Sequence, residues 1–340
     1  MKKATAVFSV CLVMAALCAV PGSAQTTADR AGELQTMTKT PIIFATYASD
    51  DQALYWALVM AESIRQFGGD MRNAPIWVYR PEGQPDIDSM QRKKQETLAV
   101  ILKTIPIPED AQGAWFAGKV NASAAAETDA EGKGIILAWL DPDEIFVKEP
   151  KEFLLPDSVS FGYRPVMHKL IGSLYSEPPD EFWSRVYARL SVPESAVFPV
   201  VSPLDQLTLR AYFNAGILIV RPERGLLRRW PGCFRTLYSD SVFAEWCRTD
   251  QLRAIFLHQA ALAGDVLTLL KQSETMDLPS TYNYPAYFHD RYPAETKPKS
   301  LDDVVMFRHE FFASGRGFMD ITTITDAKIV DWVRQRLPRK

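Results

Sequence analysis

The 340-residue sequence has little of what marks several large classes of protein. It has four cysteines, and two of them, Cys11 and Cys18, lie in the first twenty residues. The remaining two are too few to build a zinc site or a disulfide scaffold. With 38 basic and 41 acidic residues the net charge is −3, and no Lys/Arg cluster dominates any stretch, so no nucleic-acid partner is expected. A Ser-His-Asp order and the HExxH, Walker A and GxGxxG motifs are also lacking.

The N-terminus has the three parts of a secretory signal peptide. Basic residues start the chain, an apolar run follows over 4–20, and residues 21–24 are Pro-Gly-Ser-Ala. We therefore predict a signal peptide over 1–24, with an uncleaved anchor as the less favoured alternative. The protein is then exported, to the periplasm or medium of a bacterium or to the secretory lumen of a eukaryote. No comparable apolar run follows, so no transmembrane span is expected after cleavage.

Behind the signal peptide, residues 25–40 are polar and aperiodic, which predicts a flexible linker, and residues 41–340 are predicted to form one domain. That domain has a folded protein's composition, with 47% hydrophobic and 23% charged residues over the whole chain. Its two cysteines, Cys233 and Cys247, are 14 residues apart. They are equally compatible with one disulfide and with two separately buried thiols.

Strand and helix patterns alternate along the domain. Short apolar runs predict strands over 41–46, 75–79, 100–105 and 134–140, and helical periodicity predicts helices from Ser49 or Asp50 to Phe67, over 89–99 and over 115–128. A strand, a helix and a second strand form a βαβ unit with parallel strands. We therefore predict an α/β domain. Residues 326–337 are predicted to form a helix that packs on the core.

The most apolar run of the domain, 134–140, ends on Asp141-Pro142-Asp143. Ligands bind at the carboxyl ends of strands in open α/β sheets. Pro142 disfavours a helical conformation of Asp141, and alternate residues of an extended chain point to the same side, so both carboxylates can face one hard cation. On the tripeptide alone, ordinary turn chemistry at a strand end is the favoured explanation.

Another apolar strand, which begins near Phe213, opens with Asn214 and Gly216. A buried amide needs hydrogen-bond partners, so Asn214 either caps the local backbone in an Asx turn or contacts a polar ligand. Gly216 permits a close backbone approach. Both interpretations of this turn stay open.

In this order, the three features resemble the GT-A nucleotide-diphospho-sugar glycosyltransferases, above all glycosyltransferase family eight. The features are the strand from Pro41, the D-x-D element followed by Ile-Phe-Val, and the segment 213–216 followed by an apolar strand and Arg-Pro. The resemblance covers roughly residues 41–318. It implies a GT-A-like (Rossmann-like) mixed sheet with helices on both faces, in a single domain.

The resemblance also implies a divalent metal site. In the family, a cation that is usually Mn²⁺ is held by the D-x-D carboxylates and a later His, and it bridges the donor diphosphate. Asp141 and Asp143 match the carboxylates, and His309 matches the histidine. Two carboxylates and an imidazole suit manganese, which would act as a Lewis acid on the departing diphosphate.

Other family residues are carried over with the donor. Asn214 and Gly216 match the turn that binds the donor sugar, Gln259 matches a family Gln beside it, and Thr46 and Tyr47 lie where the nucleotide sits. Two departures stand out. His258 replaces an acid before Gln259, and the family's basic tail is reduced to Gly315 and Arg316, whose cation can meet a phosphate. The list of expected site residues is Asn214 and Gln259 as catalytic, Thr46, Tyr47, Gly216 and Arg316 as donor-binding, and Asp141, Asp143 and His309 as metal ligands.

The expected function is therefore metal-dependent transfer of a hexose from a nucleotide-diphosphate sugar to a glycan or another acceptor. Export stands against it, because nucleotide sugars are made in the cytoplasm and do not cross membranes. The alternative is an exported, non-catalytic carbohydrate-binding protein with a degenerate transferase fold. No general base can be assigned, so the sequence does not distinguish retention from inversion.

Overall fold

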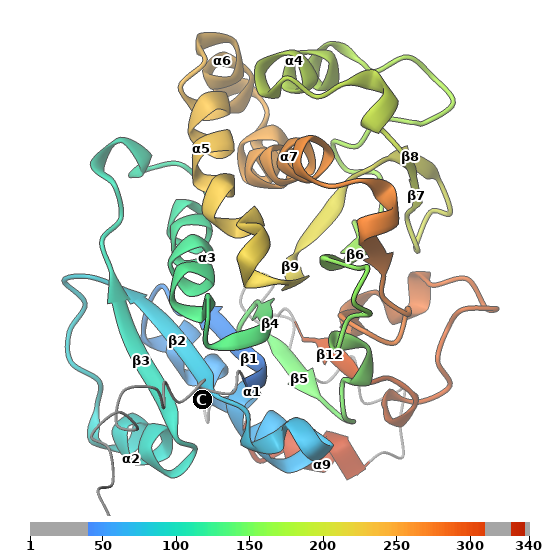
Figure 1. The fold of residues 1–340 in the computed structure, drawn as a ribbon. Coiled ribbons are helices and arrows are strands. Elements are labelled where there is room, and N and C mark those ends of the chain that lie inside the picture. The colour runs from blue at the N-terminus through green and yellow to red at the C-terminus, as the bar shows by residue number, and fades with distance from the viewer. Residues whose placement is uncertain (1–39, 310–327, 337–340) are drawn as a thin grey trace, which may run out of the picture. The chain divides into compact units, whose positions relative to one another are not determined.

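The computed structural model describes residues 40–309 and 328–336, which belong to the unit Thr38–Lys340 (Figure 1). The predicted signal peptide, the predicted linker except Thr40, and Arg316 lie outside the described residues. The strands are β1 (Thr40–Tyr47), β2 (Ile76–Pro81), β3 (Val100–Ile105), β4 (Gly134–Leu140), β5 (Glu144–Phe146), β6 (Phe161–Pro165), β7 (Pro199–Val201), β8 (Thr208–Arg210), β9 (Phe213–Val220), β10 (Thr275–Asp277), β11 (Tyr284–Pro285) and β12 (Met306–Arg308). The helices are α1 (Asp51–Phe67), α2 (Ser89–Thr97), α3 (Ala117–Ala130), α4 (Glu181–Leu190), α5 (Leu226–Tyr238), α6 (Ser241–Thr249), α7 (Gln251–Leu269) and α9 (Lys328–Arg334).

A seven-stranded sheet in the order β10-β6-β9-β4-β1-β2-β3 forms the centre of the described residues. The pairs β1–β2, β1–β4 and β2–β3 are all parallel, as the βαβ pattern predicts. Strand β9 runs antiparallel to both β4 and β6. A second sheet has three strands in the order β11-β12-β5, and its strand β5 follows β4 in the chain. The predicted mixed α/β sheet is therefore confirmed.

Helices cover both faces of the large sheet. Along β1, Ile43 and Ala45 join a buried cluster with residues of α3, α5 and α7, whereas Ile42 and Phe44 join a cluster with residues of α1. This alternation is what a strand buried on both faces requires. Helix α3 packs on α5, and α5 packs on α7 (Figure 1).

The local signals that start and stop these elements are those seen in the sequence. Asp50 is the N-cap of α1, where its carboxylate accepts a hydrogen bond from the Ala53 N–H at 2.8 Å. Strand β4 spans the predicted 134–140, and β1 begins one residue earlier than predicted, at Thr40. Helix α9 buries Ile329, Val330, Trp332 and Val333, which confirms the core-packing interpretation for its described part.

Helix α7 is, by length and composition, apolar enough to cross a membrane, which the sequence analysis did not expect. Within the unit, 61% of its apolar window is buried. It packs against α4, α5, α6 and β9. Such burial is typical of the central helix of a globular domain.

The two cysteines of the domain are both free and half-buried. Cys233 lies on α5 and Cys247 on α6, so the disulfide alternative is wrong and the separate-thiol alternative is confirmed. Burial raises the pKa of the Cys233 thiol to about 12, which keeps it protonated and unreactive at neutral pH.

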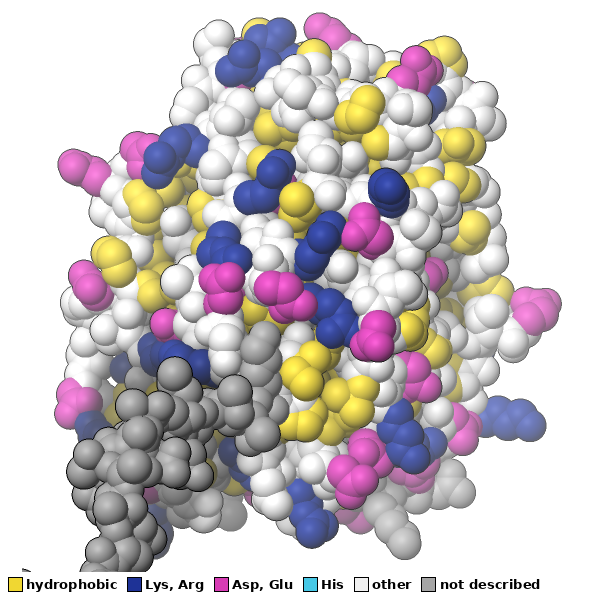
Figure 2. Space-filling view, viewed as in Figure 1, with side chains coloured by type: hydrophobic (Ala, Val, Ile, Leu, Met, Phe, Trp, Pro, Cys, Tyr) yellow, Lys and Arg dark blue, Asp and Glu magenta, His cyan; other side chains and the backbone are white. Residues whose placement is uncertain are grey.

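Charged side chains of both signs are interspersed on the face shown in Figure 2. Several pair across elements, as Arg228 does with Glu131 at 2.6 Å and Arg224 with Glu274 at 2.8 Å. Partly exposed pairs of this kind contribute little to stability individually.

A fully buried carboxyl, Glu127 on α3, caps the first turn of α5. It accepts a hydrogen bond from the Arg228 backbone N–H at 2.8 Å, where the N-cap Gly225 has no side chain to do so. Burial raises the pKa of Glu127 from 4.5 to about 7, against the opposing effect of the backbone N–H groups and the Arg228 cation.

Because the folded-state pKa of Glu127 lies above the unfolded one, its contribution to stability is complete below pH 4.5 and is lost as the pH rises through 7. Glu127→Gln removes this dependence. As the pH rises from 4.5 to 8, we expect the variant to gain about 3 kcal/mol in free energy of unfolding relative to wild type. Urea denaturation of both proteins at each pH measures this difference. Parallel pH profiles for the two proteins would show that Glu127 titrates normally.

Candidate functional site

The site lies where β4 ends. The chain leaves the sheet at Leu140, passes through Asp141-Pro142-Asp143 and enters β5. Strand β12 pairs antiparallel with β5 and places Arg308 opposite Glu144. A segment some 160 residues later in the sequence is thereby brought beside the two aspartates. The Asp141 backbone N–H donates to the Gly216 carbonyl of β9 at 2.8 Å, which fixes the turn to the sheet.

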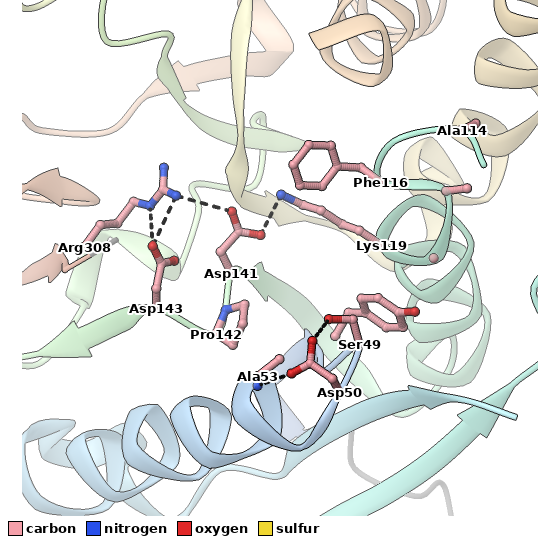
Figure 3. A pocket seen from close by; sticks show the side chains of 13 residues that line it. Ser49, Asp50, Ala53, Ala114, Phe116, Lys119, Asp141, Pro142, Asp143 and Arg308 are labelled. Carbon is pink, nitrogen blue, oxygen red and sulfur yellow. Dashed lines mark hydrogen bonds and ion pairs between the residues drawn. The ribbon is translucent and has the colours of Figure 1, made fainter. Parts of the chain in front are cut away.

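Two cations approach Asp141 from opposite sides (Figure 3). The Lys119 ammonium, from α3, lies 2.6 Å from Asp141 Oδ1. The Arg308 guanidinium, from β12, lies 3.8 Å from Asp141 Oδ2. Both basic side chains are largely buried, with 9% of the Lys119 side chain and 13% of the Arg308 side chain exposed.

Arg308 is closer to the second aspartate, Asp143. Its Nε and Nη2 donate to Asp143 Oδ2 at 3.3 and 3.2 Å. Burial alone would raise the pKa of the Asp143 carboxyl, but Arg308 and His309 outweigh it, and the pKa is lowered. Asp143 Oδ1 is buried and accepts no hydrogen bond from the described residues.

In two further titratable groups at this edge, burial favours the uncharged form. Burial raises the pKa of Glu144 well above its ordinary value, and the neighbouring Asp143 raises it further. Its Oε1 accepts a hydrogen bond from the Asn283 amide. Burial also lowers the pKa of His258 well below its ordinary value. The ion pairs at the D-x-D turn join two carboxylates and two cations.

The structure places His309 beside the aspartates through its backbone. Its N–H donates to the Asp143 carbonyl at 3.2 Å, and its buried ring packs on Trp56 with the centroids 4.2 Å apart. Burial lowers the pKa of the His309 imidazole to about 4, so the ring is neutral at physiological pH. A neutral imidazole is the protonation state that a metal ligand requires.

The predicted manganese ligands fit by chemistry but not by arrangement. Across residues 40–309 and 328–336, no group of three His, Cys, Asp or Glu residues is placed to hold a metal ion. Three of the four carboxylate oxygens of Asp141 and Asp143 already face Lys119 or Arg308. A divalent cation would have to displace at least one of these side chains, so the described residues do not fit a preformed metal site.

A cavity of about 460 Å³ opens on one side of the D-x-D turn. Its walls include Tyr47, Ala114, Phe116 and Gly118, and its floor is formed by the two aspartates, Lys119 and Arg308. Of the predicted nucleotide-binding pair, Tyr47 lines this cavity. Thr46 is fully buried and lines neither this cavity nor the next.

A second cavity of about 450 Å³ lies on the other side of Asp141. Asn214, Gly216 and Gln259 all line it, so the structure brings these three predicted residues together. Asn214 Oδ1 accepts the Gly216 N–H at 2.7 Å, so the Asx-turn interpretation and exposure to a cavity both hold. Gln259 Oε1 is buried and has no hydrogen-bond partner among the described residues.

Aromatic side chains form much of the wall of this second cavity. They come from the start of α3 and from the segment after β11, and they are Trp115, Phe116, Tyr287 and Phe288. Phe116 has a φ of 65°, a left-handed conformation that is unusual for a bulky residue. Strained backbone of this kind is concentrated at functional sites.

The sequence analysis missed Lys119, Arg308 and Phe116. Lys119 is one polar residue in an Ala-rich helix, and Arg308 precedes the His309 that the family resemblance selected. Neither has a motif of its own. The one available signal was the position of Arg308, a charged residue at the end of an apolar run, which is compatible with a buried cation.

Comparisons with known proteins place residues 45–266 in one family. This segment matches the model of the Rhodobacterales glycosyltransferase domain. No curated protein matches the chain.

Among solved structures, the galactosyltransferase LgtC in complex with donor and acceptor sugar analogs is 15% identical, with 87% of this chain and 100% of LgtC covered and a TM-score of 0.41. Mouse xyloside xylosyltransferase 1 is 12% identical, with 80% and 98% covered and a TM-score of 0.44. Core-mannan synthase A from Aspergillus fumigatus, in its Mn/GDP form, is 8% identical, with 71% and 73% covered and a TM-score of 0.40. Likeness at this level does not indicate the substrate of the present chain.

Proposed function

Because the chain belongs to the Rhodobacterales glycosyltransferase domain family, we propose that it transfers a hexose from a nucleoside-diphosphate sugar to a glycan acceptor. The match of residues 45–266 to this family, together with the mixed seven-stranded sheet, confirms the prediction of a GT-A-like glycosyltransferase that resembles family eight. The identities of the donor and of the acceptor are the proposed parts.

The observation that carries this proposal is the shared wall of the two cavities. Phe116, Lys119, Asp141 and Arg308 line both of them. Transfer between two substrates requires that their reacting atoms be held within contact distance. Two adjoining hollows of about 460 and 450 Å³, each in the size range of small-molecule sites, supply one place for a nucleotide and one for sugars.

The linings favour one substrate for each cavity. The first cavity offers the Tyr47 ring and apolar wall residues to a nucleoside, with Lys119 and Arg308 at its floor. The second offers amide groups of Asn214 and Gln259 together with the aromatic wall, a combination suited to sugar hydroxyls and to the apolar face of a pyranose ring. The diphosphate then lies between them, at Lys119 and Arg308.

Negative charge develops on the nucleoside diphosphate as it departs. Cations fixed beside that charge lower the barrier because they need no reorganisation during the reaction. Manganese bound by Asp141, Asp143 and His309 stays a prediction. Export of the chain through residues 1–24 is likewise proposed from the sequence, and detection of a mature N-terminus at Gln25 in a periplasmic or secreted fraction tests it.

Gln259 provides the test of the cavity assignment. We expect wild-type protein to hydrolyse one member of a panel of UDP- and GDP-hexoses, with water in place of the acceptor. Gln259→Ala should slow this hydrolysis about 100-fold because the hexose loses a positioning contact. The affinity for the free nucleoside diphosphate, measured by calorimetry, should change less than about threefold because Gln259 does not line the nucleotide cavity.

Gln272→Ala serves as the matched control, because Gln272 is exposed and lines neither cavity. Equal loss of nucleotide affinity and of hydrolysis in Gln259→Ala would contradict the assignment of separate cavities. Binding of glycans without any nucleotide binding or hydrolysis would favour a carbohydrate-binding protein instead.

A further inference from the structure

The carboxylates of the D-x-D turn are already paired with cations of the protein itself. Lys119 and Arg308 come from elements far apart in the sequence, α3 and β12, and both contact Asp141, while Arg308 also contacts Asp143. The separations of 2.6 Å for Lys119 to Asp141 and 3.2 Å for Arg308 to Asp143 are those of charge-assisted hydrogen bonds and close ion pairs.

Among the described residues, both carboxylates that would hold a metal ion are already paired. Asp141 contacts the Lys119 ammonium and the Arg308 guanidinium, and Asp143 contacts the same guanidinium. A divalent cation on the same oxygens would lie within a few ångströms of two buried positive charges. Coulomb repulsion at that distance is strong where water is largely excluded.

The same arrangement suits a diphosphate. Arg308 presents a planar fork of donors that matches phosphate geometry, and Lys119 presents a compact point charge. Both line the nucleotide cavity and the sugar cavity, so both reach the junction where the diphosphate of a donor must lie. The aspartates hold the two cations in place and lower the cost of keeping them largely buried.

We propose that Lys119 and Arg308 hold the diphosphate of the donor in place of a divalent metal ion, so that nucleoside diphosphates bind to this protein without one. The inference rests on the proposed function, because it names the groups that recognise the donor in the same site. It differs from the sequence expectation, in which manganese held by Asp141, Asp143 and His309 makes this contact.

Calorimetric titration with UDP and with GDP tests the inference, each with an excess of EDTA and again with Mn²⁺. For the nucleotide that binds, we expect the affinity with EDTA to lie within about threefold of that with Mn²⁺. Lys119→Gln and Arg308→Gln should each weaken binding in EDTA about tenfold or more, since each removes a charged hydrogen-bond donor. The binding should also weaken as the salt concentration rises.

Lys103→Gln is the control for the loss of a lysine ion pair. Lys103 contacts Asp129 at 2.6 Å, the same distance as in the Lys119 pair, but lines neither cavity. Its nucleotide affinity should equal that of wild type. Thermal unfolding of each variant shows whether it folds, and Arg308→Lys, which keeps the charge and loses the fork, replaces Arg308→Gln if that variant does not.

A further measurement distinguishes the two accounts. With Mn²⁺ alone, electron paramagnetic resonance should show weak binding to wild type and tighter binding to Arg308→Gln, whose carboxylates are no longer matched. If manganese makes the contact, Arg308→Gln retains nucleotide binding.

The outcomes separate the inference from the function it rests on. Nucleotide binding that occurs only with Mn²⁺ overturns the inference and leaves the transferase proposal standing. So does undiminished binding by folded Lys119→Gln and Arg308→Gln in EDTA. No binding of UDP or GDP under either condition contradicts the nucleotide-sugar proposal itself.

Discussion

Replacement of Gly216 by alanine is expected to reduce donor hydrolysis about 100-fold while the protein remains folded. A Cβ at this position would lie 2.8 Å from Asp141 Oδ2 and 2.9 Å from Asn214 Oδ1, which is closer than such atoms approach. Either side chain must move, and with Asp141 moves the contact that positions Lys119 and Arg308. The folded state should lose about 1 to 3 kcal/mol, the usual range for overpacking.

Gly232→Ala is the matched control for the Gly216 variant. Gly232 lies on α5, where an added Cβ meets no atom within 4 Å. Alanine there should leave hydrolysis unchanged and stabilise the helix by up to about 1 kcal/mol. If Gly216→Ala hydrolyses donor at the wild-type rate, the close approach of β9 to Asp141 has no role in the site.

Truncation of Trp139 to alanine is expected to lower the free energy of unfolding by about 3 to 5 kcal/mol. Trp139 is fully buried on β4, where it pairs with Ala45 of β1 and Leu218 of β9. The cavity left behind would lie in the strand that ends at Asp141. Urea denaturation followed by circular dichroism measures the loss, and a decrease below about 1 kcal/mol would contradict the central packing role of this side chain.

Trp139→Phe separates packing from hydrogen bonding. The Trp139 Nε1 has no hydrogen-bond partner among the described residues, so a phenyl ring loses volume but no polar contact. We therefore expect a smaller loss than in the alanine variant. An equal loss in both variants would show that the indole N–H has a partner.

The elements of the fold were predictable because local chemistry specifies them. Strand β4 was placed at both ends by its apolar run, bounded by Gly134 and by the Asp141-Pro142 pair, and α1 was placed by its Asp50 cap. The antiparallel direction of β9 was not predictable in this way. Its sequence is apolar in either direction, and only its pairing with β4 and β6 sets its orientation.

The sequence singled out candidate residues that lie in local turns and missed those that reach the same place only through tertiary contacts. Asp141, Asn214 and Gly216 meet because β4 and β9 are neighbours, and the family resemblance already paired them. Lys119 and Arg308 meet the aspartates only after α3 and β12 have packed. A single lysine on an Ala-rich helix carries no periodic or motif signal that distinguishes it from a solvated side chain.

His309 lies beside the D-x-D turn, where the family resemblance placed it, but the contacts that the structure shows there include more than its ring. The resemblance placed it beside the D-x-D turn, and its backbone N–H does bond to the Asp143 carbonyl. Its ring, however, packs on Trp56, while the side chain of the preceding Arg308 reaches Asp143. The neighbouring position, Arg308, therefore supplies a carboxylate contact that the resemblance did not predict.

A crystal structure with the bound nucleoside diphosphate tests the central claim most directly. We predict that the nucleoside lies in the cavity beside Tyr47 and that phosphate oxygens lie within hydrogen-bond distance of Lys119 Nζ and of the Arg308 guanidinium. A nucleotide bound elsewhere on the protein, or a diphosphate in this cavity that contacts neither cation, would contradict the account.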